Sequence, residues 1–318
     1  MSRLWGLIIL ALWISCGKAD RTEAEIAGID IDLKVSRFDM AFANSSPDDL
    51  PELKKNYPYL FPERFPDSVW IARMQDSLQR ELSAEVWKQF PGFDAPAAEL
   101  RALFQHTAYY FPGFRPPKII TVTADVDYNN KVIYADSLLL IALDTYLGKD
   151  HYFYHGIPDY LKKNSTREQI AVDAASQIAQ HYVPYPQERT FLAQMLFYGK
   201  LLYLKDLLIP SKTDPEKIGY TEDELLWAET NEAEVWRYFV ERNLLFSTDL
   251  KLRERFTDAA PFSKFYLELD QESPGQIGRY IGWKIVKAYM KNNTVSLQQL
   301  LNAPAEAILN RSRFKPEK

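Results

Sequence analysis

The chain has 318 residues and a formal net charge of −5, with 47% hydrophobic and 25% charged residues. This composition is typical of a folded protein with one large or two ordinary domains. The negative charge, without any broad basic stretch, excludes a nucleic-acid-binding protein that works by neutralising phosphates. It also gives no support for electrostatic binding to a membrane surface. We therefore expect no nucleic-acid partner.

The first residues have the features of a bacterial lipoprotein signal peptide. Arg3 supplies one positive charge, an apolar run covers residues 4–14, and Ser15 precedes Cys16, the only cysteine of the chain. The apolar run is too short to cross a hydrocarbon core about 30 Å thick. We predict a signal peptide over residues 1–15 and acylation of Cys16, for example with palmitate. The alternatives, a single-pass anchor or a signal cleaved elsewhere, leave Cys16 unexplained.

The segment after Cys16 predicts a tether. Residues 17–28 are small and charged and have no apolar period, which favours a flexible connection between lipid and domain. The lipidated cysteine and tether then span residues 16–28, and a single globular domain spans residues 29–318.

The N-terminal half predicts one strand, two helices and a hairpin. Apolar residues alternate over 29–35, which indicates a half-buried strand. Apolar residues then recur every four positions from Trp70 to Val86, which predicts one long helix that begins at Asp67 or Ser68 and ends near Phe90. A second helix is expected over about 96–110. The runs 118–123 and 132–135 flank Asn129-Asn130, and this favours a β-hairpin because Asn tolerates positive φ.

The C-terminal half, from residue 165 onward, is almost wholly helical in its pattern. Capping boxes at Ser165…Glu168, Thr221…Glu224 and Ser296…Gln299 predict three helix starts, and Ser273-Pro274 predicts another, with Pro at the first helical position. No internal repeat and no Gly/Ser linker divides the chain. We predict an α+β fold in which a mainly helical C-terminal half packs on a small N-terminal sheet.

The helix expected over about 166–182 has polar residues at the spacing of a zinc-binding helix. Asp173, Gln177 and His181 follow one another at four-residue steps. A zinc peptidase needs two neutral imidazoles four residues apart and a glutamate after the first of them. Asp173 and Gln177 cannot supply this pair, so we expect no metal and no other cofactor. The helix face is then a solvated polar surface with His181 near its end.

Two further features suggest packing or binding surfaces. Gly278 and Gly282 lie inside a predicted helix, where glycine costs about 1 kcal/mol relative to alanine. With Trp283 they predict a face that another element approaches closely, and the alternative is a surface for a partner or ligand. The aromatic loop around His151 and His155 is read as a packing plug, or alternatively as a binding surface.

A succession of short segments resembles the gliding-motility lipoprotein GldB family of the Bacteroidetes. The likeness spans roughly residues 118–316. The segments that carry it are 147–151 (LGKDH), 197–203 (FYGKLLY), 218–221 (IGYT), Asn231-Glu232 with Val235-Trp236, 244–249 (LLFSTD), 260–263 (APFS), 273–278 (SPGQIG) and 282–286 (GWKIV). The resemblance implies an envelope lipoprotein that is needed for gliding and is tied to the type IX secretion apparatus. It assigns no biochemical activity to a residue.

The resemblance also implies a distant likeness to zinc peptidases of the gluzincin kind. In this sequence the places of the metal ligands would be held by Asp173, Gln177 and Tyr198, so the scaffold would be a degenerate, zincin-like pseudo-peptidase. We therefore expect a non-enzymatic scaffold or assembly factor in the cell envelope. Its lipid anchor would hold it at a membrane, facing the periplasm in preference to the cell surface. The alternatives are a residual hydrolase acting on envelope peptides and a lipoprotein that binds peptide or glycan.

Overall fold

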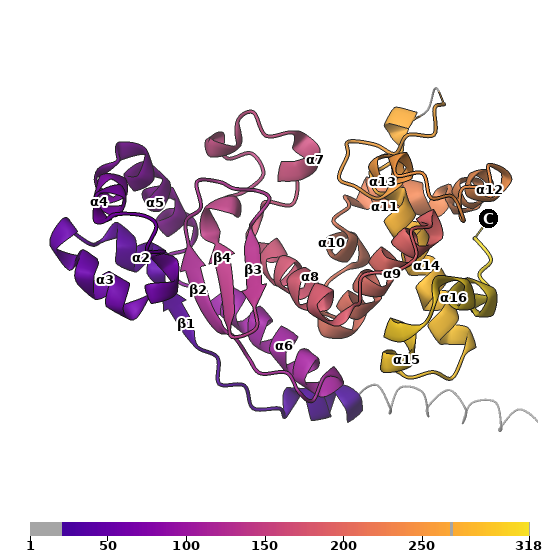
Figure 1. The fold of residues 1–318 in the computed structure, drawn as a ribbon, viewed down its shortest axis with the longest axis horizontal. Helices are drawn as coiled ribbons and strands as arrows, with labels where there is room; N and C mark the ends of the chain where they lie inside the picture. The colour runs from indigo at the N-terminus through magenta and orange to yellow at the C-terminus, as the bar shows by residue number, and fades with distance from the viewer. Residues whose placement is uncertain (1–20, 268–269, 318) are drawn as a thin grey trace, which may run out of the picture.

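The computed structural model describes residues 21–267 and 270–317, so the predicted signal peptide and Cys16 lie outside the described residues. Figure 1 shows a half that contains the sheet and a half made of helices, side by side. The predicted α+β class is confirmed. The strands are β1 (Val35–Arg37), β2 (Lys118–Val122), β3 (Val132–Ala135) and β4 (Leu138–Ala142).

Helices account for most of the remaining chain. In the half that contains the sheet they are α2 (Phe38–Ala43), α3 (Leu50–Asn56), α4 (Asp67–Gln75), α5 (Ser77–Gln89), α6 (Asp94–Tyr110), α7 (Asp159–Lys162) and α8 (Ile170–Tyr182). In the helical half they are α9 (Phe191–Leu208), α10 (Asp214–Ile218), α11 (Glu222–Thr230), α12 (Glu232–Glu241), α13 (Lys251–Phe256), α14 (Ile277–Asn292), α15 (Leu297–Asn302) and α16 (Ala305–Ser312). Among the described residues, no helix has the length and apolarity needed to span a membrane.

The described strands form a mixed sheet in the order β1-β2-β4-β3. β2 pairs in parallel with β1 on one side and with β4 on the other, and β3 pairs antiparallel with β4 at the edge. Ile119, Ile120 and Thr121 on β2 are fully buried, as expected for a strand with neighbours on both sides. The chain between β1 and β2 forms α2 to α6, which lets two parallel strands pair.

The predicted hairpin between residues 118–123 and 132–135 is wrong. β3 instead forms a tight hairpin with β4 through Asp136 and Ser137, and Asp136 has a φ of 43°. The sequence Leu138–Ala142 is a continuous apolar run, and such a run cannot be told from buried helix by its period. Because the sequence pattern does not reveal β4, it pairs residues 118–123 with residues 132–135, although both runs pair with β4.

The tether and the first strand also differ from the prediction. Residues 21–27 are helical, and Ile26 is only 1% exposed, so the folded part begins inside the segment expected to be flexible. Hydrogen bonds from Gln105 to the carbonyl groups of Ala27 and Ile29 fasten this segment to α6. The alternating pattern over 29–35 is mostly irregular chain, and β1 begins only at Val35. The alternation reflects burial of Ile31 without ladder pairing.

The long helix predicted to end near Phe90 is interrupted. Asp76 has an extended backbone, with ψ of 128°, and its carboxylate caps α5 by accepting a hydrogen bond of 2.9 Å from the backbone N–H of Gln79. Aspartate favours this capping position over a helix interior, because its side chain satisfies the free N–H groups of the first turn. The four-residue apolar period continues across the break and so hides it.

Helix α9 is the central element of the molecule, because it contributes to both major cores. Leu204 and Leu208 pack in the core of the sheet-containing half, whereas Leu192 and Met195 pack in the core of the helical half. A helix that is apolar nearly all round is expected to be buried. The two halves therefore share one helix.

Helices α9 and α14 cross at glycines. A Cβ atom built on Gly282 would overlap the carbonyl oxygen of Met195, and one built on Gly199 would overlap the carbonyl group of Gly282. The two backbones thus touch where both helices lack a side chain. Gly278 is in a similar position against Phe256, whose carbonyl oxygen would lie 2.9 Å from an added Cβ.

Candidate functional site

Four charged residues act on one another electrostatically, and we call them the inter-half cluster: Asp173 affects the pKa of Lys131 and Lys205, and Arg279 affects that of Lys205. Lys131 precedes β3, Asp173 lies on α8, Lys205 on α9 and Arg279 on α14. Each side chain is partly buried but keeps some contact with solvent. Neighbouring elements of both halves therefore contribute to one polar site.

Asp173 is the carboxylate of this cluster. Its Oδ2 accepts a hydrogen bond of 2.8 Å from the hydroxyl of Tyr146, which is fully buried. Burial, helped by the Asp173 carboxylate, raises the pKa of Tyr146 well above its usual value, so the hydroxyl remains a donor at neutral pH. Tyr146 thus holds Asp173 in place.

Lys131 reaches the cluster from the edge of the sheet. Its Nζ donates to the Ser165 hydroxyl at 3.1 Å and to the Asn164 carbonyl at 3.3 Å, and it lies 5.3 Å from the centre of the Tyr146 ring. Burial lowers the pKa of Lys131, and the nearby Asp173 carboxylate opposes this effect.

Lys205 and Arg279 complete the cluster from the helical half. The Nζ of Lys205 donates to the Lys217 carbonyl at 2.7 Å, and burial lowers the pKa of Lys205 to about 8. The Nε of Arg279 donates to the Thr257 carbonyl at 2.6 Å, and its guanidinium lies 3.9 Å from the centre of the Tyr198 ring. Burial also lowers the pKa of Arg279, and the charge of Arg279 further lowers that of Lys205.

The charges of this site are not balanced. Within the described part of the chain, Lys131, Lys205 and Arg279 form hydrogen bonds with neutral oxygens and no ion pair. Asp258, the carboxylate that acts on Arg279, pairs with Arg253 at 3.4 Å. Within the inter-half cluster, three cations thus accompany one carboxylate, and the cluster carries an excess of positive charge.

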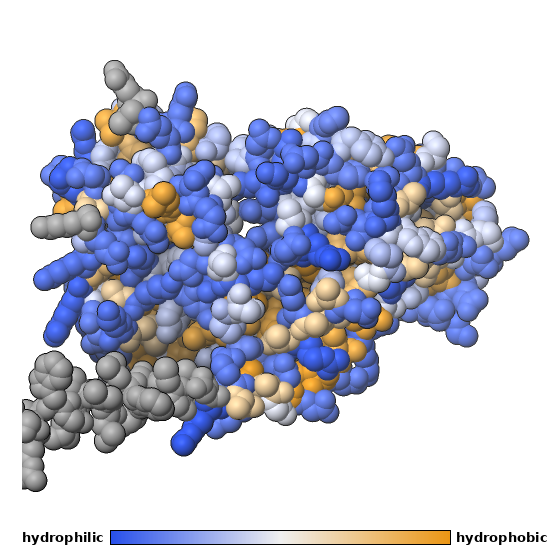
Figure 2. Space-filling view, turned by 180° about the vertical axis from the view of Figure 1, so that it is seen from behind, coloured by the Kyte–Doolittle hydropathy of each residue, from blue (hydrophilic) through white to orange (hydrophobic). Residues whose placement is uncertain are grey.

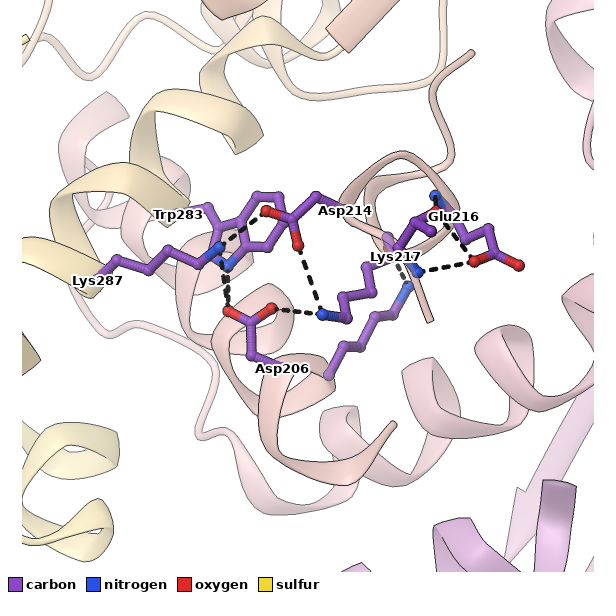
Figure 3. A network of polar contacts seen from close by, with 8 residues as sticks. Asp206, Asp214, Glu216, Lys217, Trp283 and Lys287 are labelled. Atoms are coloured by element: carbon purple, nitrogen blue, oxygen red, sulfur yellow. Dashed lines mark hydrogen bonds and ion pairs between the residues drawn. The ribbon is translucent and has the colours of Figure 1, made fainter. Parts of the chain in front are cut away.

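A neighbouring network shows what a balanced site looks like in this protein. Figure 3 shows Asp206, Lys217, Asp214 and Lys287 linked in a ring beside Trp283. Lys217 lies 3.1 Å from Asp206 and 3.4 Å from Asp214, and Lys287 contacts the same two carboxylates at 3.4 and 3.2 Å. The indole of Trp283 donates to Asp206 at 2.8 Å. Two lysines and two aspartates thus neutralise one another and join α9, α10 and α14.

The structure brings some of the predicted site residues together. Asp173 and Tyr198 both belong to the surroundings of the inter-half cluster, Asp173 as its carboxylate and Tyr198 as the ring beneath Arg279. Gln177 lies one turn further along α8 and is half-buried. His181 is exposed at the end of α8, 3.5 Å from the carboxylate of Asp136. The described residues contain no group of three His, Cys, Asp or Glu side chains that could hold a metal ion.

Gly278, Gly282 and Trp283 lie inside the helical half. Both glycines are buried against backbone of neighbouring helices, and Trp283 is 1% exposed. This is the internal-packing arrangement, and a partner could not reach these residues without moving α9 or α14.

A second region of interest is an aromatic cavity of about 370 Å³ on the helical half. Trp227, Tyr238 and Phe265 line it, between α11, α12 and the segment after α13. Large apolar side chains that are 45–73% exposed surround this end of the molecule, and we call them the apolar end: Leu226, Val240, Phe246, Leu250, Tyr266 and Leu267. Figure 2 shows apolar groups at its upper left, at the end formed by the helical half.

The aromatic loop after Gly148 packs against α5. His151 stacks on Phe153 and lies 3.1 Å from the Glu85 carboxylate, while the Tyr152 hydroxyl donates to Glu81 at 2.7 Å. The interaction with His151 lowers the pKa of Glu85. The loop is thus fastened to the half that contains the sheet, as expected of a packing element, although Tyr152 remains 43% exposed.

Sequence reasoning missed Lys131, Lys205 and Arg279. A usable signal existed for Lys205, because Lys200, Lys205 and Asp206 interrupt the otherwise apolar sequence of α9. Charged residues in a helix that is buried nearly all round must find partners or a ligand. No signal of this kind marks Lys131, which precedes a short edge strand.

Comparison with known proteins identifies the family. Searches of curated proteins and of solved structures find no significant match. A family model, described as gliding motility protein GldB, matches residues 19–316 and so covers nearly the whole chain. The chain therefore belongs to the GldB family of gliding motility proteins.

Proposed function

We propose that this protein is a lipid-anchored scaffold or assembly factor of the cell envelope, required for gliding and linked to type IX secretion. The family supports the association with gliding motility. The finer elements, acylation of Cys16, a periplasm-facing domain and a non-enzymatic role, are our proposals.

The apolar end is the observation that carries the scaffold role. It combines six exposed apolar side chains with an aromatic cavity, all from residues 226–270. Exposed apolar side chains that gather in one region are typical of protein-binding surfaces, and aromatic side chains often dominate the energy of such contacts. An envelope protein of the gliding machinery is the proposed occupant.

The inter-half cluster supports a role without metal chemistry. A zinc ion carries two positive charges, and the surroundings of Asp173 already hold an excess of cations. Placing a further cation there would be electrostatically unfavourable. This positive charge is compatible with the proposed relation to a degenerate peptidase scaffold. Such a scaffold would have lost both the zinc-binding side chains and the negative charge that attracts a metal ion.

Complementation of a strain that lacks the gene tests this proposal. We expect Leu250→Asp and Leu267→Asp to abolish gliding, because a charge in an apolar contact must lose its hydration. The matched control is Leu78→Asp, since Leu78 is 56% exposed on α5, in the other half of the molecule. Asp173→Asn and Gln177→Ala should leave gliding intact. A hydrolase would be favoured instead if the Asp173→Asn and Gln177→Ala variants lost gliding at normal protein level while the Leu250→Asp and Leu267→Asp variants retained it.

A further inference from the structure

A polar cavity lies in the half that contains the sheet, remote from the apolar end. Its volume is about 190 Å³, and residues of α2, α4 and α5 line it together with Thr123, which directly follows β2. Figure 1 shows these three helices grouped at the left, on the side of the sheet away from the helical half. Because β1, β2 and β4 run parallel, Thr123 marks the edge where these strands have their carboxyl ends. Open α/β sheets bind their ligands at this edge.

One wall of this cavity is an exposed indole. Trp87 lies on α5 and is 48% exposed, although tryptophan is on average a highly buried residue. Gln79 and Ser83 precede it at four-residue steps, so all three lie on one face of α5, and each of them lines the cavity. A flat apolar surface beside amide and hydroxyl groups suits a ligand that has one apolar face and several hydrogen-bonding groups.

The cavity also carries positive charge. Arg73 and Arg80 line it, and none of its lining residues is an aspartate or glutamate. Arg73 pairs with Asp125 at 2.7 Å. Arg80 has no ion pair among the described residues and donates only from Nε, to the Met74 carbonyl at 3.3 Å. The two terminal nitrogens of Arg80 are therefore available to bind one carboxylate of a ligand, in the two-pronged geometry that arginine favours.

A strained turn next to the cavity holds two of its lining side chains in place. Asp125 and Val126 have φ values of 53° and 59°, a backbone conformation that is unfavourable for a β-branched residue such as Val126. The fully buried carboxylate of Asp144 fixes this turn by accepting the backbone N–H of Val126 at 2.7 Å. The turn thereby presents Asp125 to Arg73 and Gln79, which both donate to its carboxylate. Strained backbone of this kind is concentrated at ligand sites.

We propose that this cavity binds an acidic sugar, that is, a pyranose ring that carries a carboxylate. The C–H groups on one face of such a ring would stack on Trp87. Its hydroxyls would exchange hydrogen bonds with Gln79 and Ser83, whose amide and hydroxyl groups both donate and accept. Its carboxylate would pair with Arg80.

Charge and size select this class of ligand. One unpaired arginine balances the single charge of a carboxylate, whereas a phosphate monoester carries about −1.5 to −2 at neutral pH. The cavity is smaller than the sites of drug-sized ligands, which span about 300–1,000 Å³, so it suits one sugar unit of a chain that continues along the surface. The proposal does not depend on the scaffold role, because the cavity and the apolar end lie in different halves of the molecule.

Isothermal titration calorimetry of the full-length protein in detergent, with the trimer of galacturonic acid as ligand, tests this site. We expect binding of one trimer per chain. Trp87→Ala and Arg80→Gln should each weaken it at least about tenfold, because they remove the stacking surface and the carboxylate partner. The matched control is Lys88→Gln, which should bind as the wild type does, since Lys88 is another exposed cation of α5 but does not line the cavity. Circular dichroism checks that each variant is folded.

Two further ligands test the chemistry of recognition. Maltotriose, a neutral sugar, should bind at least about tenfold more weakly than the galacturonate trimer, because it lacks the charge that pairs with Arg80. The trimer of glutamic acid, which has carboxylates and no sugar ring, should not bind measurably. The proposal is overturned if the wild-type protein does not bind the galacturonate trimer, or if folded Trp87→Ala and Arg80→Gln proteins bind it as the wild type does. Equally tight binding of the glutamate trimer would overturn it in favour of an acidic peptide, and equally tight binding of maltotriose in favour of a neutral glycan.

Discussion

Replacing Gly282 by alanine should destabilise the protein, although alanine is the better helix former. Intrinsic propensity alone would favour the variant by about 1 kcal/mol. The added Cβ would overlap the carbonyl group of Met195, and this is backbone of the crossing helix that no rotamer change can move. Overpacking of a core costs typically about 1–3 kcal/mol, and a clash between two backbones falls at the upper end of that range.

The clash therefore outweighs the propensity, and we expect a net loss of about 2 kcal/mol in the free energy of unfolding. For a protein of this size, that corresponds to a fall of roughly 5 °C in Tm. Urea denaturation of the wild-type and Gly282→Ala proteins measures the difference. Gly113→Ala is the control, because an added Cβ there has nothing within 4 Å. A Gly282→Ala protein as stable as the wild type would refute the close crossing of α9 and α14.

Three further predictions concern buried charge and the anchor. Lys205→Met should be more stable than the wild type at pH 7 by at most about 3 kcal/mol. That advantage should vanish as the pH rises from about 8 towards 10.5. In this window the folded wild type loses a proton from Lys205 that the unfolded chain still binds. A stability difference in urea titrations that does not change with pH would contradict this. Glu232→Ala should lower the free energy of unfolding by about 2 kcal/mol and more than Glu232→Gln does, since the buried carboxylate accepts from the Tyr280 hydroxyl at 2.7 Å and pairs with Lys284 at 3.3 Å. Cys16→Ser should move the protein from the membrane pellet to the soluble fraction or leave it unprocessed, and a processed variant that still pellets would show attachment by another route.

The helices were predictable where one pattern dominated. The expected helix over about 96–110 corresponds to α6, and the capping boxes at Thr221 and Ser296 begin α11 and α15 as expected. At these positions the side chain that satisfies the first turn is itself part of the sequence signal. The starts expected at Ser165 and at Ser273-Pro274 are wrong, because Thr166 precedes the first helical turn there and α14 begins only at Ile277. Asp76 shows the limit of the approach, because its cap interrupts a period that continues on both sides.

The sheet was less predictable because strand pairing is non-local. β2 and β4 are apolar runs whose period does not say which strand lies beside them. Asn129-Asn130 and Asp136-Ser137 are both possible turns, and the neighbouring sequence does not show which of them joins two paired strands.

The candidate site was half predictable, and the reason is physical. The four-residue steps of α8 placed Asp173 on one face, but the charges that define its chemistry come from α9, α14 and the edge of the sheet. Asp173 acts on Lys131 and Lys205, which lie 42 and 32 positions away in the sequence, so these residues come together only through tertiary packing. The spacing pattern thus found the carboxylate and could not show that cations surround it.

The early start of the folded part changes how the proposed anchor would act. With the chain helical from residue 21 and Ile26 buried, only four residues separate Cys16 from the described domain. Even fully extended, a connection of this length reaches no more than about 18 Å. Figure 1 shows the helix that begins the described chain at the lower edge, below α6, whereas α12 and α13 lie towards the upper right. A lipid on Cys16 would therefore hold the first region close to the bilayer and leave the apolar end directed away from it, available to a partner in the envelope.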